Sequence, residues 1–137
     1  MNKYQRWFTP AVWLGVFANI VGFVIPVLLS PAWLLTRLHL PYTPYQDIWL
    51  RDAALLLLFL SILYLPAASD PLRYKANAII GAVGRLIFCV FWIWPVLFAN
   101  APRGYLIVGA LDGTIGLIQG ILLYKLLREE ERLDADA

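Results

Sequence analysis

The sequence predicts an all-α membrane protein, a four-transmembrane-helix bundle with a short interfacial segment between helices 1 and 2. Hydrophobic residues make up 61% of the 137 residues and charged residues only 15%, whereas a soluble domain has about half and about a quarter. Four apolar runs approach or exceed the roughly 20 residues that a helix needs to cross a bilayer. Most charges lie between these runs or beyond the last one, which is typical of a multi-pass protein.

The four predicted spans are residues 8–29, 50–67, 76–98 and 105–127. We expect Thr9 to cap the first helix and Pro10 to occupy its first helical position. Asp70 and Pro71 are expected to begin the third helix in the same way. The first run is longer than the apolar core of a signal peptide, so we predict that it is a retained helix.

Residues 31–49 form the one long connection between predicted spans. Its first half is apolar and its second half is broken by Pro41 and Pro44, which predicts a helical turn at the membrane surface followed by an extended stretch. Large apolar side chains are expected to face lipid or a partner protein, namely Trp33, Leu34, Leu38, Tyr42 and Tyr45. Polar side chains are expected to face headgroups or water, namely Arg37, His39 and Asp47.

The distribution of Lys and Arg predicts the orientation of the chain. With both termini inside and Arg85 left out of the count, seven basic residues lie on the cytoplasmic side and three on the outer side, as the positive-inside rule requires. The inner ones are Lys3, Arg6, Arg73, Lys75, Lys125, Arg128 and Arg132, and the outer ones are Arg37, Arg51 and Arg103. We therefore predict a multi-pass protein of the bacterial inner (plasma) membrane with both termini cytoplasmic. Residues 128–137 are expected to leave the membrane as a polar helical tail.

Several classes of function lack support in the sequence. A single cysteine, Cys89, excludes an internal disulfide, and a single histidine, His39, excludes a bis-histidine haem within one chain. We predict no metal site and no cofactor, with a quinone or a lipid left open as a ligand. Nucleic acid is not expected as a partner, because the basic residues are scattered. Acid–base chemistry could use Asp112 with Tyr105, but no nucleophile, metal set or phosphate loop accompanies them, so an enzymatic role is not favoured.

Arg85 and Asp112 are charges deep inside predicted spans. An unpaired ion there costs about 2.5–3.5 kcal/mol on insertion scales. Their backbone depths differ by about 8 Å at 1.5 Å per residue, a gap that an arginine can bridge, so we expect a bidentate ion pair. One interpretation is that the pair only locks two helices in register. The other is that it lines a polar pocket reached from the outer face, with Tyr105 and Gln119 a heptad either side of Asp112 and Asp52 near the mouth.

Four glycines follow one side of the last predicted span, at Gly109, Gly113, Gly116 and Gly120. Small residues at such spacings let another helix approach closely. The neighbouring helix belongs either to the same chain or to a partner chain, and the sequence leaves both open. Asn19, in the first span, is expected to hydrogen-bond to a neighbouring helix.

A set of short motifs indicates a family resemblance. Asp70-Pro71-Leu72-Arg73-Tyr74 precedes a predicted helix that holds Gly84-Arg85, and Leu111-Asp112-Gly113 lies in the last helix. Over residues 51–127, this four-span plan resembles the DoxX-like group of small bacterial membrane proteins. Some members of that group are membrane subunits of quinone-linked or redox-protective complexes, so the resemblance implies an accessory role.

Two functional hypotheses follow. The first is an accessory or structural subunit of a larger bacterial inner-membrane complex, redox- or quinone-linked. The alternative is a membrane binding or transport protein in which Arg85 and Asp112 form a polar site for a small lipophilic ligand or lipid. The expected partners are the lipid bilayer and either other membrane protein subunits or further copies of the chain.

Overall fold

The structure, a computed structural model, describes residues 3–135 and confirms the predicted all-α fold. Residues 1–2, and residues 136–137 of the predicted tail, lie outside the described part. The elements in chain order are α1 (Lys3–Asn19), η1 (Ile20–Val24), α2 (Ile25–Leu29), α3 (Pro31–Arg37), η2 (Pro44–Gln46), α4 (Asp47–Ser69), α5 (Lys75–Phe98) and α6 (Gly104–Ala135). Four continuous helical stretches are long and apolar enough to cross a membrane: Lys3–Leu29, Pro44–Ser69, Lys75–Phe98 and Gly104–Ala135.

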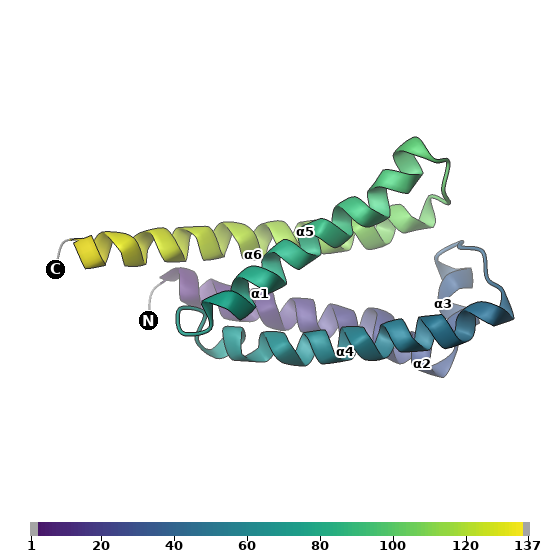
Figure 1. Cartoon of the computed structure of the whole chain (residues 1–137), viewed down its shortest axis with the longest axis horizontal. Coiled ribbons are helices and arrows are strands. Elements are labelled where there is room, and N and C mark those ends of the chain that lie inside the picture. The colour runs from purple at the N-terminus through teal and green to yellow at the C-terminus, as the bar shows by residue number, and fades with distance from the viewer. Residues whose placement is uncertain (1–2, 136–137) are drawn as a thin grey trace.

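The long helices form two pairs, α1 with α4 and α5 with α6, and both termini lie at one end of the bundle (Figure 1). Each long helix makes its main contacts with two others, because α1 also packs against α6 and α4 also packs against α5. At the end away from the termini the two pairs diverge (Figure 1). The four-helix packing is therefore concentrated in the half of the bundle that holds the termini.

The main hydrophobic core explains this concentration. It is built from one aromatic side chain and from small and branched side chains, and draws on all four long helices: Phe8, Val12, Val16, Ala67, Ala68, Ala78 and Leu123. Alanines on α4 and α5 let the helix backbones come close there. A smaller cluster of Val27, Leu34 and Ala54 joins α2, α3 and α4 in the other half. Within the described residues, no comparable cluster joins the α5–α6 pair to the α1–α4 pair at that end.

The prediction that Thr9 and Pro10 begin the first helix is wrong, since α1 already runs through Lys3. The Thr9 hydroxyl instead donates a hydrogen bond to the Ala68 carbonyl at 2.7 Å, near the end of α4. A contact across helices thus takes the place of the expected cap. Pro10 lies inside the helix, where it removes one backbone hydrogen bond.

A π-helical turn, η1, interrupts the first span, where the sequence predicts an unbroken helix. The Ile25 N–H donates to the Ile20 carbonyl, one residue further back than in an α-helix. Pro26 follows at once, and a proline ring clashes with the carbonyl four residues earlier, here that of Gly22. The wider turn relieves this clash and lets the span continue to Leu29.

The connection between the first two spans has the predicted order, a short helix (α3) followed by a non-helical stretch. Trp33 and Tyr45 are exposed by 52% and 89%, as expected for side chains that face outward. The predicted direction of Leu34 is wrong, because this side chain is buried against the cluster of Val27 and Ala54. α3 therefore turns one apolar edge onto the bundle.

Leu38 also departs from the predicted outward direction. Leu38 packs against the small cluster that contains Leu34. The Leu38 carbonyl lies so close to Gly104 that any side chain at position 104 would collide with this carbonyl. The Tyr42 hydroxyl donates to an Asp47 carboxylate oxygen at 2.6 Å. This hydrogen bond to a negative group raises the pKa of Tyr42. The connection thus closes the end of the bundle away from the termini by contacting the start of α6.

The connection between α4 and α5 corrects the prediction that Asp70 and Pro71 begin a helix. The Asp70 carboxylate accepts the Arg73 N–H at 3.1 Å within a turn, and α5 begins only at Lys75. The polar tail continues α6 without a break. An ion pair of 2.6 Å between Lys75 and Glu130 ties it to the start of α5.

Three of the four glycines along one side of the last span face α5. A Cβ atom would lie 2.6 Å from Ile93 Cγ1 at Gly109, 2.6 Å from Cys89 Sγ at Gly113 and 2.9 Å from Arg85 Cβ at Gly116. Real Cβ contacts are longer than this, so α5 and α6 are as close as glycine permits. At Gly120 a Cβ would meet no atom within 4 Å among the described residues.

This difference predicts opposite effects for two alanine substitutions in α6. Gly109→Ala forces α5 and α6 apart, since the neighbouring atoms include the Cys89 backbone carbonyl, and should destabilise the protein by about 1–3 kcal/mol. Gly120→Ala adds helix propensity without a clash and should be neutral or stabilising by about 0.5–1 kcal/mol. Unfolding in mixed detergent micelles measures both. Equal destabilisation by the two variants would contradict the close α5–α6 packing.

Candidate functional site

The centre of the bundle holds an ion pair between α5 and α6. Arg85 Nη1 donates to Asp112 Oδ1 at 2.9 Å, and the two side chains are 6% and 22% exposed. Gly116 makes the pair reachable, because its missing side chain lets Arg85 Cβ and the Leu86 backbone nitrogen lie against α6. The expected pairing of these two charges is confirmed. The two residues lie on different helices and are 27 positions apart in the sequence.

The expected bidentate geometry is wrong, because a third residue takes the second nitrogen of the guanidinium. Arg85 Nη2 donates to Asn19 Oδ1 at 3.2 Å. Asn19 Nδ2 in turn donates to Ser61 Oγ at 3.0 Å, and Ser61 donates to the Leu57 carbonyl at 2.8 Å. Asn19 therefore bonds to neighbouring helices as predicted. One chain of hydrogen bonds joins α6, α5, α1 and α4.

Gly15 on α1 provides the space for the guanidinium. A Cβ at this position would lie 2.7 Å from Arg85 Nη2 and 3.0 Å from Gln119 Nε2. Gln119 is buried and donates to the Ala11 carbonyl at 2.9 Å. Arg85 and Gln119 thus flank the same glycine, so the predicted neighbourhood of Gln119 and the ion pair exists, with Gln119 serving as a tie between α6 and α1.

Not every polar atom of this network is satisfied internally. Arg85 Nε is buried and has no hydrogen-bond partner among the described residues. A buried donor of this kind ordinarily costs about 1–3 kcal/mol when left unpaired. Asp112, by contrast, stays partly exposed. The site can therefore still donate one hydrogen bond and accept others.

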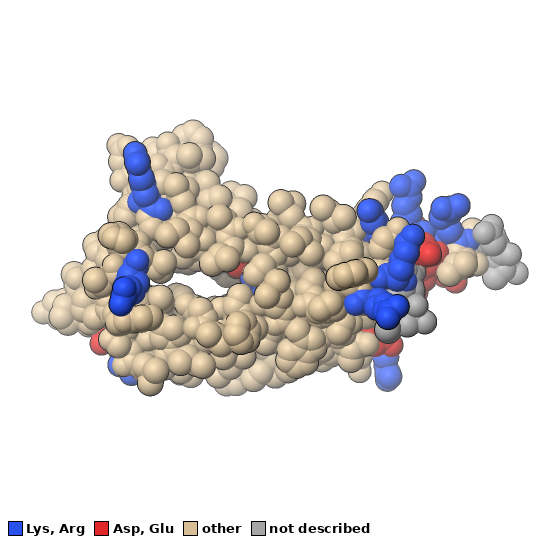
Figure 2. Space-filling view, turned by 180° about the vertical axis from the view of Figure 1, so that it is seen from behind, with Lys and Arg blue, Asp and Glu red and all other residues tan. Residues whose placement is uncertain are grey.

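An opening leads toward the middle of the molecule. Figure 2 shows it between the upper and lower parts of the molecule in that view, with acidic and basic atoms visible at its inner end. It faces sideways relative to the long axis, so in a membrane it would open to lipid rather than to water. The contact of Leu38 with Gly104 lies at the end of the bundle away from the termini. This lateral opening was not predicted from the sequence.

Two of the predicted site residues lie apart from the network. The Tyr105 ring stacks on Trp92, with centroids 5.4 Å apart and planes at 17°. Asp52 is exposed, and within the described residues no hydrogen bond or ion pair links it to Arg85 or Asp112. Tyr105 thus supports the α5–α6 pair and Asp52 belongs to the outer surface of α4.

Three residues of the site were missed in the sequence analysis. Ser61 and Tyr64 are the only polar side chains in the middle of the leucine-rich second span, and this isolation was a usable signal. The Tyr64 hydroxyl lies 3.6 Å from where a Cβ of Gly84 would be, beside Arg85. Gly15 gave no such signal, since a single glycine in an apolar helix is common.

Among the described residues, the site offers a free hydrogen-bond donor on Arg85 and acceptor oxygens on the partly exposed Asp112. Within residues 3–135 no group of three or more His, Cys, Asp or Glu side chains could hold a metal ion. Comparisons with protein-family models, with curated proteins and with solved structures found no match for this chain.

The hydrogen-bond chain predicts an effect for a very small substitution. Ser61→Ala deprives Asn19 Nδ2 of its acceptor in a buried position, and should lower stability by about 0.5–2 kcal/mol. Ser69→Ala is the matched control, because Ser69 is exposed and bonds only to the Pro66 carbonyl of its own helix. Detergent unfolding compares the two. A Ser61→Ala variant as stable as Ser69→Ala would contradict a contribution of the network to stability.

Proposed function

We propose that this membrane protein binds a small lipophilic ligand at the Arg85–Asp112 pair and admits it sideways from the bilayer. The observation that carries the proposal is a buried ion pair with unused hydrogen-bonding capacity beside an opening. Arg85 Nε has no partner among the described residues, and Asp112 is the more exposed member of the pair. Ionisable residues within a membrane are functional candidates by default.

The unused hydrogen-bond donor and acceptor groups indicate the chemical class of the ligand. Arg85 Nε offers a donor, so it suits a carbonyl or ether oxygen, and the carboxylate of Asp112 suits a hydroxyl donor. A quinone and its quinol together present both groups on an apolar body. The resemblance to the DoxX-like group, some of whose members belong to quinone-linked complexes, supports the same class.

The proposed location is the bacterial inner membrane, with both termini in the cytoplasm. Its support is the distribution of charge, because Lys and Arg gather at the end of the bundle that holds the termini and only scattered basic residues lie at the other end (Figure 2). Such an excess of basic residues is typical of cytoplasmic loops. The ligand would then enter through the outer half of the bilayer.

The proposal predicts that Asp112→Asn weakens ligand binding at least about ten-fold, equivalent to about 1.4 kcal/mol. The amide keeps the shape of the side chain and an oxygen for Arg85, but it loses the charge that accepts a ligand hydroxyl. Titration of the protein in nanodiscs with a short-chain ubiquinol, and with the corresponding quinone, measures the affinity. Asp52→Asn removes the same charge from an exposed position and should bind like the unchanged protein.

Two outcomes would contradict the ligand site. Unchanged binding by Asp112→Asn would do so, as would an equal loss in Asp52→Asn. A purely structural pair has a different signature, since stranding one partner of a buried pair costs about 3–5 kcal/mol. Asp112→Asn would then fold poorly, and the double variant Arg85→Met/Asp112→Leu would restore the folded yield.

A second candidate function is that of an accessory subunit of a larger membrane complex. The observation that favours it is the small burial of two spans: in their most apolar stretches, α4 has 11% of its residues buried and α5 17%, against 33% for the first and last spans. A large apolar helix surface can be covered by lipid or by a partner helix. The outward-facing Trp33 and Tyr45 extend this surface to the membrane boundary.

Cysteine crosslinking tests the accessory role. In a Cys89→Ala background, Trp33→Cys and Tyr45→Cys should both capture the same membrane protein in native membranes. Phe17→Cys, which is equally accessible on α1 but lies in the middle of a span, is the control and should give adducts with lipid. Adducts from both outer sites that are confined to lipid or to this chain would argue against a docked partner, as would purification in gentle detergent only as a monomer.

A further inference from the structure

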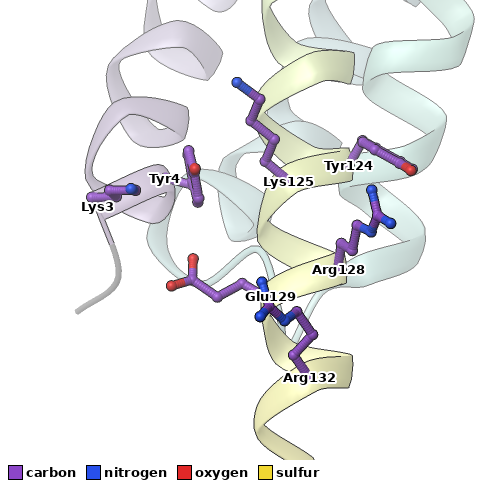
Figure 3. A pocket seen from close by; sticks show the side chains of 7 residues that line it. All are labelled: Lys3, Tyr4, Tyr124, Lys125, Arg128, Glu129 and Arg132. Carbon is purple, nitrogen blue, oxygen red and sulfur yellow. The ribbon is translucent and has the colours of Figure 1, made fainter.

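A second, separate site lies at the end of the bundle that holds both termini. There the start of α1 and the last turns of α6 enclose an open groove of about 580 Å³ (Figure 3), within the range of about 300–1,000 Å³ found for ligand pockets. Its lining residues are Lys3, Tyr4, Tyr124, Lys125, Arg128, Glu129 and Arg132. Four of these side chains are cationic and one is a carboxylate, so the groove carries a positive charge.

Aromatic rings help to position the cations. The Tyr4 ring has the Lys3 ammonium 4.9 Å from its centroid and the Lys125 ammonium, from α6, at 5.8 Å. Figure 3 shows the Arg128 head group beside Tyr124 on the same side of α6. Glu129 extends from α6 toward α1 in this view and makes an interaction of its own. It offsets one of the four positive charges.

The same seam between α1 and α6 continues into the bilayer as an apolar groove. This second groove, of about 480 Å³, is lined by Trp7, Pro10, Ala11, Leu14, Ile118, Ile121 and Leu122. Trp7 is one helical turn from Lys3 on α1, and Ile121 is one turn from Lys125 on α6. The two grooves together extend about 17 Å along α1 from Lys3 to Leu14, at 1.5 Å per residue. A charged end and an apolar continuation thus form one amphipathic seam.

We propose that this seam binds one anionic phospholipid of the adjacent leaflet, with its phosphate among the four cations and an acyl chain in the apolar groove. The positive charge of the groove at the chain termini selects an anionic headgroup, because Lys and Arg near the membrane surface attract anionic lipids. A soluble phosphate would occupy only the charged groove and would leave the apolar groove empty. The site shares no lining residue with the Arg85–Asp112 pair, so it stands independently of the ligand proposed there.

Lipid retention tests this site. The full chain is reconstituted with an equimolar mixture of phosphatidylglycerol and phosphatidylcholine, exchanged into mild detergent, and examined by native mass spectrometry. The unchanged protein should retain one phosphatidylglycerol in preference to phosphatidylcholine. Arg128→Gln/Arg132→Gln should reduce this retention about 25-fold, since each basic residue near the surface contributes roughly five-fold.

The matched control removes the same charge from the same end of the bundle. Arg6→Gln/Arg73→Gln changes two exposed residues outside the groove and should reduce retention by less than about two-fold. If both double variants lose lipid equally, the attraction is a property of the whole surface and the proposed site does not exist. Displacement of the lipid by excess inorganic phosphate would likewise overturn the proposal, in favour of a soluble anion. Lys125→Gln provides a second variant and should lower retention about five-fold.

Discussion

The burial of one positive charge in an apolar bundle determines much of this structure. Arg85 is almost fully buried, and an arginine at the centre of a membrane requires a counter-ion or polar partners. Asp112 supplies the charge, Asn19 accepts a second hydrogen bond, and Ser61 satisfies the amide of Asn19. Each of these residues comes from a different long helix. A requirement that arises at one side chain therefore fixes the register of four helices, which nonspecific apolar packing in lipid could not do.

Close approach of the helices is the second condition, and glycine and alanine provide it. Gly116 lets α6 lie against Arg85 Cβ, and Gly15 leaves the volume that the guanidinium fills. The small residues of α4 and α5 that belong to the main core lie in the half of the bundle that holds the chain termini. The four helices therefore meet closely only in that half. The other half remains divided, closed at its end by the contact of Leu38 with Gly104. The opening beside the ion pair follows from this uneven distribution of small side chains.

The predictions from sequence succeeded where a local property decides the outcome. Span lengths follow from hydropathy, and the pairing of Arg85 with Asp112 follows from the cost of leaving either alone. They failed where a contact between distant segments overrides a local preference. Thr9 was expected to cap a helix, yet it bonds to the Ala68 carbonyl 59 residues away. Leu34 was expected to face lipid, yet α3 folds back so that it meets Val27 and Ala54. Neither the single hydrogen bond between Arg85 and Asp112 nor the role of Ser61 could be derived, because both depend on where α1 and α4 lie.

The two proposed sites meet at the contact between α1 and α6. Ala11 lines the apolar groove, and its carbonyl accepts the hydrogen bond of Gln119. Gln119 and the Arg85 guanidinium in turn lie against the same point of α1, Gly15. A shift of α1 along α6 would therefore break the Gln119 bond, alter the groove and move Gly15 against the guanidinium together. The position of α1 along α6 thus couples the apolar groove to the polar network.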